Sequence, residues 1–210
     1  MRSYGQYCGL AKALDVIGDR WTLLIVRELL LRDRCRYTDL RNGLPGIATN
    51  LLVERLRELE KAGIVCREEA APPVATTLFQ LTERGKELEP VVHQIGRWGG
   101  PLAAKPARKD VFRSHWLALP IKLYLRDRTP NRKPITIEVW CGDEPIVIET
   151  AGGSVNTRPG SAPDADALLK GTPQAIVGVI TGRVSLADAC ASGLRYDGDP
   201  AILRRLLPTR

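Results

Sequence analysis

Residues 99–109 read GGPLAAKPARK, a stretch in which Gly, Pro, Ala and Lys leave no apolar period. A break this dense is typical of a boundary between domains, and 210 residues are enough for two small domains. We therefore predict a first domain at residues 1–100 and a second at residues 135–210. Residues 101–134 are predicted to form a basic connector that contains a short helix.

Composition narrows the class of protein. With 44% apolar and 26% charged residues, the chain has the composition of an ordinary globular protein. Its apolar runs fall short of the roughly 18 residues that cross a bilayer, and the N-terminus lacks the hydrophobic region of a signal peptide. We expect a cytoplasmic protein that does not enter a membrane.

The sequence offers few groups for metal or covalent chemistry. Its five cysteines are widely spaced without a CxxC pair, and only two histidines accompany them. It contains no Walker loop, no GxGxxG after a strand, no HExxH and no GxSxG. We therefore expect no metal, no cofactor, no disulfide framework and no catalytic site, and predict that the protein is not an enzyme.

The first half is predicted to be mainly helical. Apolar periodicity indicates helices at residues 10–17, 21–31, 39–42, 48–62 and 82–98, and strand patterns lie at 64–69 and 76–81. Asp19 and Thr38 are predicted to cap the second and third helices, and Gly63 to end the fourth in a left-handed conformation. Pro90 is expected to bend the last helix or to delay its start.

The last helix of this half carries a narrow apolar seam formed by Leu88, Val91, Ile95 and Trp98. An apolar seam on a helix at the edge of a domain is expected to pack against another helix. Two partners remain open, a second copy of the chain and the rest of the same domain.

A short helix, a tight Gly/Pro turn, a longer helix and a two-stranded hairpin follow one another between residues 38 and 81. This order predicts a helix-turn-helix with a wing, whose second helix enters the major groove of DNA. Asn pairs with adenine, Thr contacts the thymine methyl group, and Arg binds guanine or phosphate. The polar face of the longer helix carries such residues, namely Thr49, Asn50, Val53, Glu54 and Arg57, with Arg55 at its margin. The pattern also suits a surface helix whose arginines only pair with glutamates.

Three stretches of this half carry a family resemblance: YCGLAKALDVIGDRWTLLIVRELL, RYTDLRNGLPGIATNLLVERLRELEKAGIV and QLTERGKELEPVVHQIGRW. They resemble the HxlR-type regulators, a branch of the MarR-like winged-helix transcription factors, over almost all of residues 7–98. The resemblance implies a homodimer on double-stranded DNA. It also implies DNA-facing residues, namely Thr49, Asn50, Val53 and Arg55, with Arg36 and Thr38 near the backbone.

Phosphate contacts are expected mainly from the arginines around the third helix, Arg41 among them. The hairpin tip at residues 70–75 has no basic residue, and Glu68 and Glu69 stand beside Arg67, so the wing contact should be weak. Ala48 occupies the position at which the family usually has a Ser or Thr cap. The first N–H groups of that helix therefore need another acceptor.

Cys8 lies where HxlR-type proteins commonly carry a cysteine near the dimer interface, and some members use that position to sense oxidants or electrophiles. The resemblance thus implies a redox sensor at Cys8, with Lys12 one turn along to favour the thiolate. A small buried apolar residue is the alternative interpretation.

The second half begins with strands and ends with helices, the order of an α+β domain. Alternation and turn signals indicate strands at residues 135–141, 145–150, 154–157 and 194–199, and helices at 164–171, 173–182, 185–193 and 200–207. The predicted fold class of the whole chain is therefore α+β, with a winged helix-turn-helix domain in front.

The second half resembles the sterol-carrier-protein fold through PDADALLKG and ITGRVSLADACASGLRYDGDPAILRRLL. That resemblance implies a sheet covered by helices around a cavity for a hydrophobic molecule. The predicted lining residues are Ile137, Val139, Ile146, Ile148, Ile176, Val177 and Ile180. For any single one of them, a place in an ordinary core is the stronger interpretation.

Together these patterns predict a homodimeric transcription regulator that binds an inverted-repeat operator and responds to a hydrophobic small-molecule effector. The alternative is a hydrophobic-ligand carrier or enzyme accessory protein whose winged helix serves dimerisation. Residues 1–104 have a net charge of +2, residues 105–133 of +7 and residues 134–210 of −2, which gives the total of +7. The basic segment either lies along flanking DNA or is a solvated surface.

Overall fold

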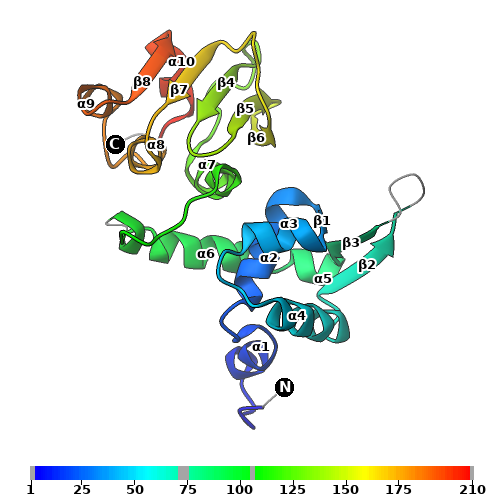
Figure 1. Cartoon of the computed structure of the whole chain (residues 1–210). Helices are drawn as coiled ribbons and strands as arrows, with labels where there is room; N and C mark the ends of the chain where they lie inside the picture. The colour runs from blue at the N-terminus through cyan, green and yellow to red at the C-terminus, as the bar shows by residue number, and fades with distance from the viewer. Residues whose placement is uncertain (1–2, 71–75, 105–106, 209–210) are drawn as a thin grey trace. The chain divides into compact units, whose positions relative to one another are not determined.

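The computed structural model describes residues 3–70, 76–104 and 107–208, and the chain divides into two compact units, Met1–Ile95 and Gly96–Arg210 (Figure 1). The predicted domain boundary at residues 99–109 thus lies close to the observed division. Across the described residues, no helix combines the length and the apolar character needed to cross a membrane.

The first unit consists of helices and a three-stranded sheet. Its elements are α1 (Gly9–Ile17), α2 (Thr22–Arg32), β1 (Arg34–Arg36), α3 (Tyr37–Gly43), α4 (Thr49–Lys61), β2 (Val65–Glu69), β3 (Thr77–Leu81) and α5 (Glu83–Lys86), and α6 (Glu89–Gly99) crosses the division. The strands are antiparallel in the order β1-β3-β2. Figure 1 shows the β2–β3 hairpin extending from the helices. The first four predicted helices and the hairpin are thereby confirmed.

Helix α2 is central to this unit, as its nearly continuous apolar surface predicts. Ile25 and Leu29 are fully buried, together with Leu40 of α3 and Leu52 and Leu59 of α4. Burial of such side chains is worth roughly 1.5–3 kcal/mol each, so these residues of α2, α3 and α4 stabilise the core of the first unit.

Two predicted helix caps are wrong. The Asp19 carboxylate pairs with Arg55, and only its backbone carbonyl accepts from the Thr22 N–H, at 3.1 Å. Thr38 lies inside α3, and the Asp39 carboxylate accepts from the Arg36 N–H at 2.9 Å. The Asp19 carboxylate is thus engaged by Arg55 and does not cap α2, and α3 begins at Tyr37, one residue before Thr38.

The predicted breaks at Gly63 and Pro90 are confirmed. Gly63 follows α4 with φ +68°, a left-handed conformation that glycine adopts without strain. The segment predicted as one helix is divided into α5 and α6, and Pro90 lies in the first turn of α6. Pro is tolerated there because first-turn N–H groups have no intrahelical acceptor.

The second unit is a five-stranded sheet with helices. Its elements are α7 (Ala118–Tyr124), β4 (Thr136–Trp140), β5 (Pro145–Ala151), β6 (Ser154–Pro159), β7 (Ala167–Lys170), α8 (Pro173–Ile180), α9 (Leu186–Ala191), β8 (Arg195–Gly198) and α10 (Pro200–Leu206), preceded by short 3-10 turns at Leu102–Ala104 and Ser114–Leu117. The strand order is β6-β5-β4-β7-β8, with β4 and β7 parallel and the other pairs antiparallel. This mixed unit is α+β, as predicted.

The helix predicted at residues 164–171 is wrong, because residues 167–170 form β7. Ala167 and Leu169 point into the core at 3% and 0% exposure, while Leu168 is half-buried. Four residues are too few to show a period of two, and the Leu168–Leu169 doublet resembles a turn of helix. Pairing with β4 and β8 on both sides decides the conformation.

The predicted connector at 101–134 belongs in part to the second unit. Leu117, Ile121 and Leu125, in and beside α7, are fully buried in the same core as Ile137 of β4 and Leu203 of α10. Between Leu117 and Leu125 the only Lys or Arg is Lys122, and the other basic residues of the segment lie before and after this apolar stripe.

Candidate nucleic-acid interface

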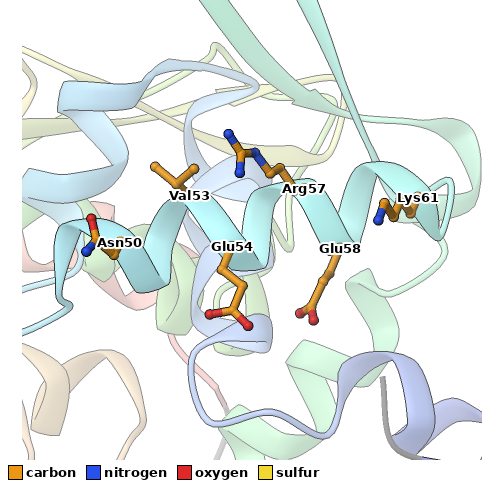
Figure 2. Close-up of a pocket in the computed structure, with 6 residues that line it drawn as sticks. All are labelled: Asn50, Val53, Glu54, Arg57, Glu58 and Lys61. Atoms are coloured by element: carbon orange, nitrogen blue, oxygen red, sulfur yellow. The ribbon is translucent and has the colours of Figure 1, made fainter.

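Helix α4 has one buried and one exposed face. Leu52, Leu56 and Leu59 are buried at 0–3% exposure. The opposite face borders an open hollow lined by Asn50, Val53, Glu54, Arg57, Glu58 and Lys61 (Figure 2). The three leucines fix the helix, so its outer side chains are presented in a defined geometry.

The exposed face of α4 is divided by charge. In Figure 2, Val53 and Arg57 project to one side of the helix, and Glu54 and Glu58 to the other. Thr49 and Asn50 are exposed in its first turn. Lys61, which the sequence reasoning missed, adds a cation in the last turn. A strip of Thr49, Asn50, Val53 and Arg57 therefore runs beside an acidic strip of Glu54 and Glu58.

Arg55 lies against the acidic strip and is not part of the strip formed by Thr49, Asn50, Val53 and Arg57. Its guanidinium pairs with the carboxylates of Asp19, Glu54 and Glu58, and its side chain is only 13% exposed. The pair with Asp19 ties α4 to the turn before α2. The structure thus gives the expected DNA-facing Arg55 a role in positioning α4, and leaves Arg57 as the exposed arginine of the helix.

The first turn of α4 has an unusual cap. Ala48 is the N-cap residue, so no side-chain oxygen accepts from the first N–H groups of the helix. The Tyr37 hydroxyl donates to the Thr49 carbonyl at 3.1 Å and joins α3 to this turn. A helix N-terminus without a side-chain cap offers its N–H groups to an anion.

Helix α3 supplies further candidate phosphate contacts. Arg36, Thr38 and Arg41 are exposed at and within this helix. Thr38 and Arg41 are three residues apart, so they share a face. An exposed hydroxyl and two guanidinium groups next to the start of α4 suit phosphate binding.

The wing carries little positive charge among its described residues. Arg34 pairs with Glu68 at 3.6 Å, and Arg67 pairs with Glu60 at 3.3 Å. Glu68 and Glu69 are exposed. The weak contact predicted for the tip concerns residues 70–75, of which 71–75 lie outside the described residues.

Cys8 is exposed at the N-cap position of α1, so the alternative of a buried apolar residue is wrong. The backbone N–H groups of Ala11 and Leu10 lower the pKa of its thiol, because they favour the thiolate. Lys12, the expected cause, lies 3.8 Å from the Asp15 carboxylate. By contrast, burial raises the pKa of Cys35 to about 12.

The predicted ligand-lining residues form a core. Ile137, Val139, Ile146, Ile148, Ile176 and Ile180 are at most 4% exposed and pack in one hydrophobic cluster, with Val177 half-buried against it. Their arrangement agrees with the interpretation that they fill the second unit.

Apolar side chains are exposed near the start of α1 and along α6. Tyr7 and Leu10, at and before the start of α1, are 107% and 69% exposed. Along α6, Val91, Ile95 and Trp98 are 39%, 48% and 76% exposed. Of the predicted seam, Val91, Ile95 and Trp98 are therefore exposed, while Leu88 is half-buried. Among the described residues, no group of three or more His, Cys, Asp or Glu side chains could hold a metal ion.

A helix pair joined by a tight turn, an exposed second helix and a hairpin attached to the same small sheet define a winged helix-turn-helix domain. The profile of the HxlR-like helix-turn-helix family matches residues 16–105, and residues 106–210 lie outside that match. The chain is 36% identical over 87 residues to YvaP of Bacillus subtilis, named an uncharacterized HTH-type transcriptional regulator, across 41% of this chain and 80% of that protein. The chain belongs to the HxlR-like helix-turn-helix family.

Other comparisons cover the same share of the chain. The similarly named protein sll1512 of Synechocystis sp. is 35% identical over 95 residues, across 44% of this chain and 70% of that protein. Among solved structures, the redox regulator HypR in its reduced form is 35% identical, with a TM-score of 0.41, across 45% of this chain and 92% of that chain.

Proposed function

We propose that this protein is a DNA-binding transcriptional regulator that inserts α4 into the major groove. The strip of exposed Thr49, Asn50 and Arg57 with half-buried Val53, on a helix fixed by buried leucines, carries the proposal. Asn50 suits adenine, Thr49 and Val53 suit the thymine methyl group, and Arg57 suits guanine or phosphate.

Phosphate contacts next to α4 set the register on the duplex. Arg36, Thr38 and Arg41 bind the backbone on one side. The first N–H groups of α4, to which Ala48 offers no side-chain acceptor, donate to a phosphate oxygen. Arg55 contributes indirectly, because its ion pairs hold α4 in place. Arg67 adds little, since Glu60 partly neutralises it.

The variants Asn50→Ala and Arg36→Ala separate recognition of DNA bases from binding to the DNA phosphates. On duplexes that the wild type selects from a randomised library, Asn50→Ala should reduce discrimination between selected and scrambled DNA by about 1–3 kcal/mol. Arg36→Ala should lower the affinity for both duplexes by the same factor and reduce the salt slope of binding by about 1. Fluorescence anisotropy at several salt concentrations measures both effects.

Glu83→Ala is a control, because this exposed residue lies on α5, outside the proposed contacts. Wild type that selects no sequence, even at low salt, would refute the proposal. It would favour the alternative of a ligand carrier or accessory protein.

The regulator acts as a homodimer on an inverted repeat in this proposal. The exposed apolar residues of α1 and α6 are the surfaces that a second copy would cover. A two-fold dimer presents two copies of α4 to half-sites about 34 Å apart.

Introducing a charge on α6 should disrupt the dimer. Ile95→Asp should lower the dimer fraction at least tenfold, because burying an unpaired carboxylate in an apolar contact is costly. Analytical ultracentrifugation measures the distribution. Val111→Asp, at a residue that is 49% exposed elsewhere in the chain, is the control. A dimer that resists Ile95→Asp would place the contact away from α6.

Cys8 is proposed as the site at which oxidants or electrophiles alter DNA binding. With a lowered pKa, its thiolate is more populated near neutral pH, so it should react with iodoacetamide much faster than buried Cys35 and Cys141. Peptide mass spectrometry after brief labelling checks the order, and exposed Cys190 serves as the internal comparison. Equal labelling of Cys8 and Cys141 in the folded protein would contradict the assignment.

An apolar effector in the second unit remains a proposal of the sequence resemblance. The seven predicted lining residues belong to or pack against the hydrophobic core, so an effector would have to open that core to bind. For this reason the proposed function does not depend on such a ligand.

A further inference from the structure

The second unit carries a concentrated set of exposed cations around the loop between α7 and β4. We call it the basic loop surface and define it by Arg126, Arg128, Arg132 and Lys133 of the loop and Arg204 of α10, all of which are exposed. The sequence reasoning identified the charge of this segment but took it for a connector.

Backbone contacts hold the loop beside the end of α10. The Arg126 N–H donates to the Leu206 carbonyl at 3.1 Å, and the Arg128 N–H donates to the Arg205 carbonyl at 3.3 Å. These bonds bring Arg126 and Arg128 next to Arg204 although almost 80 residues separate them in sequence.

The acid within the loop does not neutralise these cations. Asp127 is turned inward with a side chain only 2% exposed, and both of its oxygens accept from Arg205, at 2.7 and 2.8 Å. Arg205 also donates to the carbonyls of Thr129 and Lys133. Arg205 thus neutralises Asp127 and holds the loop in place, and the surrounding cations remain exposed to solvent.

The resulting charge is high for so small a surface. Arg126, Arg128, Arg132, Lys133, Arg204 and Arg205 are six cations against the single anion Asp127, a net +5. The adjoining β5–β6 turn, whose Gly153 approaches Pro130, adds no charge through residues 151–154. The first unit, Met1–Ile95, has 14 basic and 13 acidic residues, a net +1. The strongest concentration of positive charge therefore lies outside the helix-turn-helix domain.

Mutual repulsion among fixed cations is relieved by a partner with regularly spaced negative charges. Duplex DNA has one phosphate for about every 1.7 Å of axis, and arginine binds phosphate in a forked geometry. When the helix-turn-helix domain of the chain binds DNA, the phosphates are present at a high effective concentration for the basic loop surface of the same chain.

We propose that the basic loop surface is a second, sequence-independent DNA-binding surface that binds the phosphate backbone. The proposal rests on the proposed function, since α4 supplies the sequence selection and the loop supplies affinity. Because the loop is fixed before binding, little conformational entropy is lost when phosphates bind.

The test removes three cations whose side chains make no interaction described above. The full-length variant Arg128→Gln/Arg132→Gln/Lys133→Gln is compared with Lys170→Gln/Arg183→Gln/Arg195→Gln, which removes the same charge from other parts of the same unit. Binding to a labelled mixed-sequence duplex of about 40 base pairs is followed by anisotropy between about 50 and 200 mM KCl.

Loss of three phosphate contacts should reduce the salt slope by about 2–3. Wild type should therefore lose about 40-fold more affinity than the loop variant over this salt range. The control variant should keep the wild-type salt slope. A separate variant, Arg128→Lys/Arg132→Lys, keeps the charge of the loop and should also have the wild-type slope. Preference for the selected duplex, which Asn50 governs, should survive in the loop variant.

The outcomes separate the two proposals. Wild type that binds DNA, with a loop variant of equal affinity and slope, overturns the inference and leaves the proposed function intact. Equal losses in loop and control variants also overturn it, because net charge alone would then explain the effect. Binding to anionic phosphatidylserine vesicles that depends on the loop, while DNA binding does not, assigns the surface to membranes instead. Wild type that binds no DNA removes the proposed function itself.

Discussion

Replacing Arg205 with Met should destabilise the second unit by about 3–5 kcal/mol, the usual cost of leaving one partner of a buried ion pair without the other. The Asp127 carboxylate would lose both guanidinium bonds while its side chain stayed 2% exposed. The carbonyls of Thr129 and Lys133 would lose a donor as well. Urea unfolding followed by near-ultraviolet circular dichroism measures the change.

Arg204→Met is the matched control, because this neighbouring arginine on α10 is exposed and should change stability by less than about 0.5 kcal/mol. Combining Arg205→Met with Asp127→Leu should recover much of the loss, since no buried charge then remains. Equal stability of wild type and Arg205→Met would show that the pair is not buried in solution.

The same pair makes stability depend on pH in a defined direction. The hydrogen bonds from Arg205 lower the pKa of Asp127 below its unfolded value. Its contribution is therefore fully present above the unfolded pKa of about 3.9 and is lost as pH falls through the lower, folded value. The difference in stability between wild type and Asp127→Asn should accordingly be large at pH 7 and shrink below about pH 4.

Replacing Gly43 with Ala should destabilise the first unit by about 3 kcal/mol or more, because it disturbs another buried ion pair. A Cβ atom at Gly43 would lie 2.1 Å from Glu28 Oε2. That carboxylate is fully buried and accepts from Arg27 at 2.7 and 3.0 Å, so it cannot move away without losing its partner. The Gly43 carbonyl itself accepts from Arg27 at 3.3 Å.

Thermal unfolding compares this variant with Gly9→Ala, in which the added methyl group meets nothing within 4 Å. The control should unfold at or slightly above the wild-type temperature, since Ala favours the helical state. A Gly43→Ala protein as stable as the control would mean that Glu28 has room to rearrange.

Local patterns predicted most of the elements. The leucines of α4 repeat with a helical period, and Gly63 and Pro90 act within one or two residues of their own positions. Such features depend on neighbours in sequence, so the sequence is sufficient to predict them. Strands β1 and β7 were missed because three or four residues show no period, and only pairing with distant strands defines them.

The site was predictable in its position but not in its charges. The order of elements located α4, and the exposed Thr49 and Asn50 lie where expected. The ion pair of Arg55 with Asp19 could not be predicted, because Asp19 lies 36 residues away and reaches Arg55 only through the fold. For Cys8 the sequence left two interpretations open, a redox sensor and a small buried residue, and only its place before α1 shows that the side chain is exposed.

The bonds between the α7–β4 loop and the last turn of α10 also bear on synthesis of the chain. The N–H groups of Arg126 and Arg128 bond to the carbonyls of Leu206 and Arg205, and β4 pairs with β7, so residues made early bond to residues made late. The second unit can therefore complete its folding only after its final helix has left the ribosome. The contacts of the first unit are complete far earlier, and domains generally fold as they emerge. A stalled or truncated chain would therefore release a folded helix-turn-helix unit attached to an unfolded second unit whose core residues are exposed to proteases.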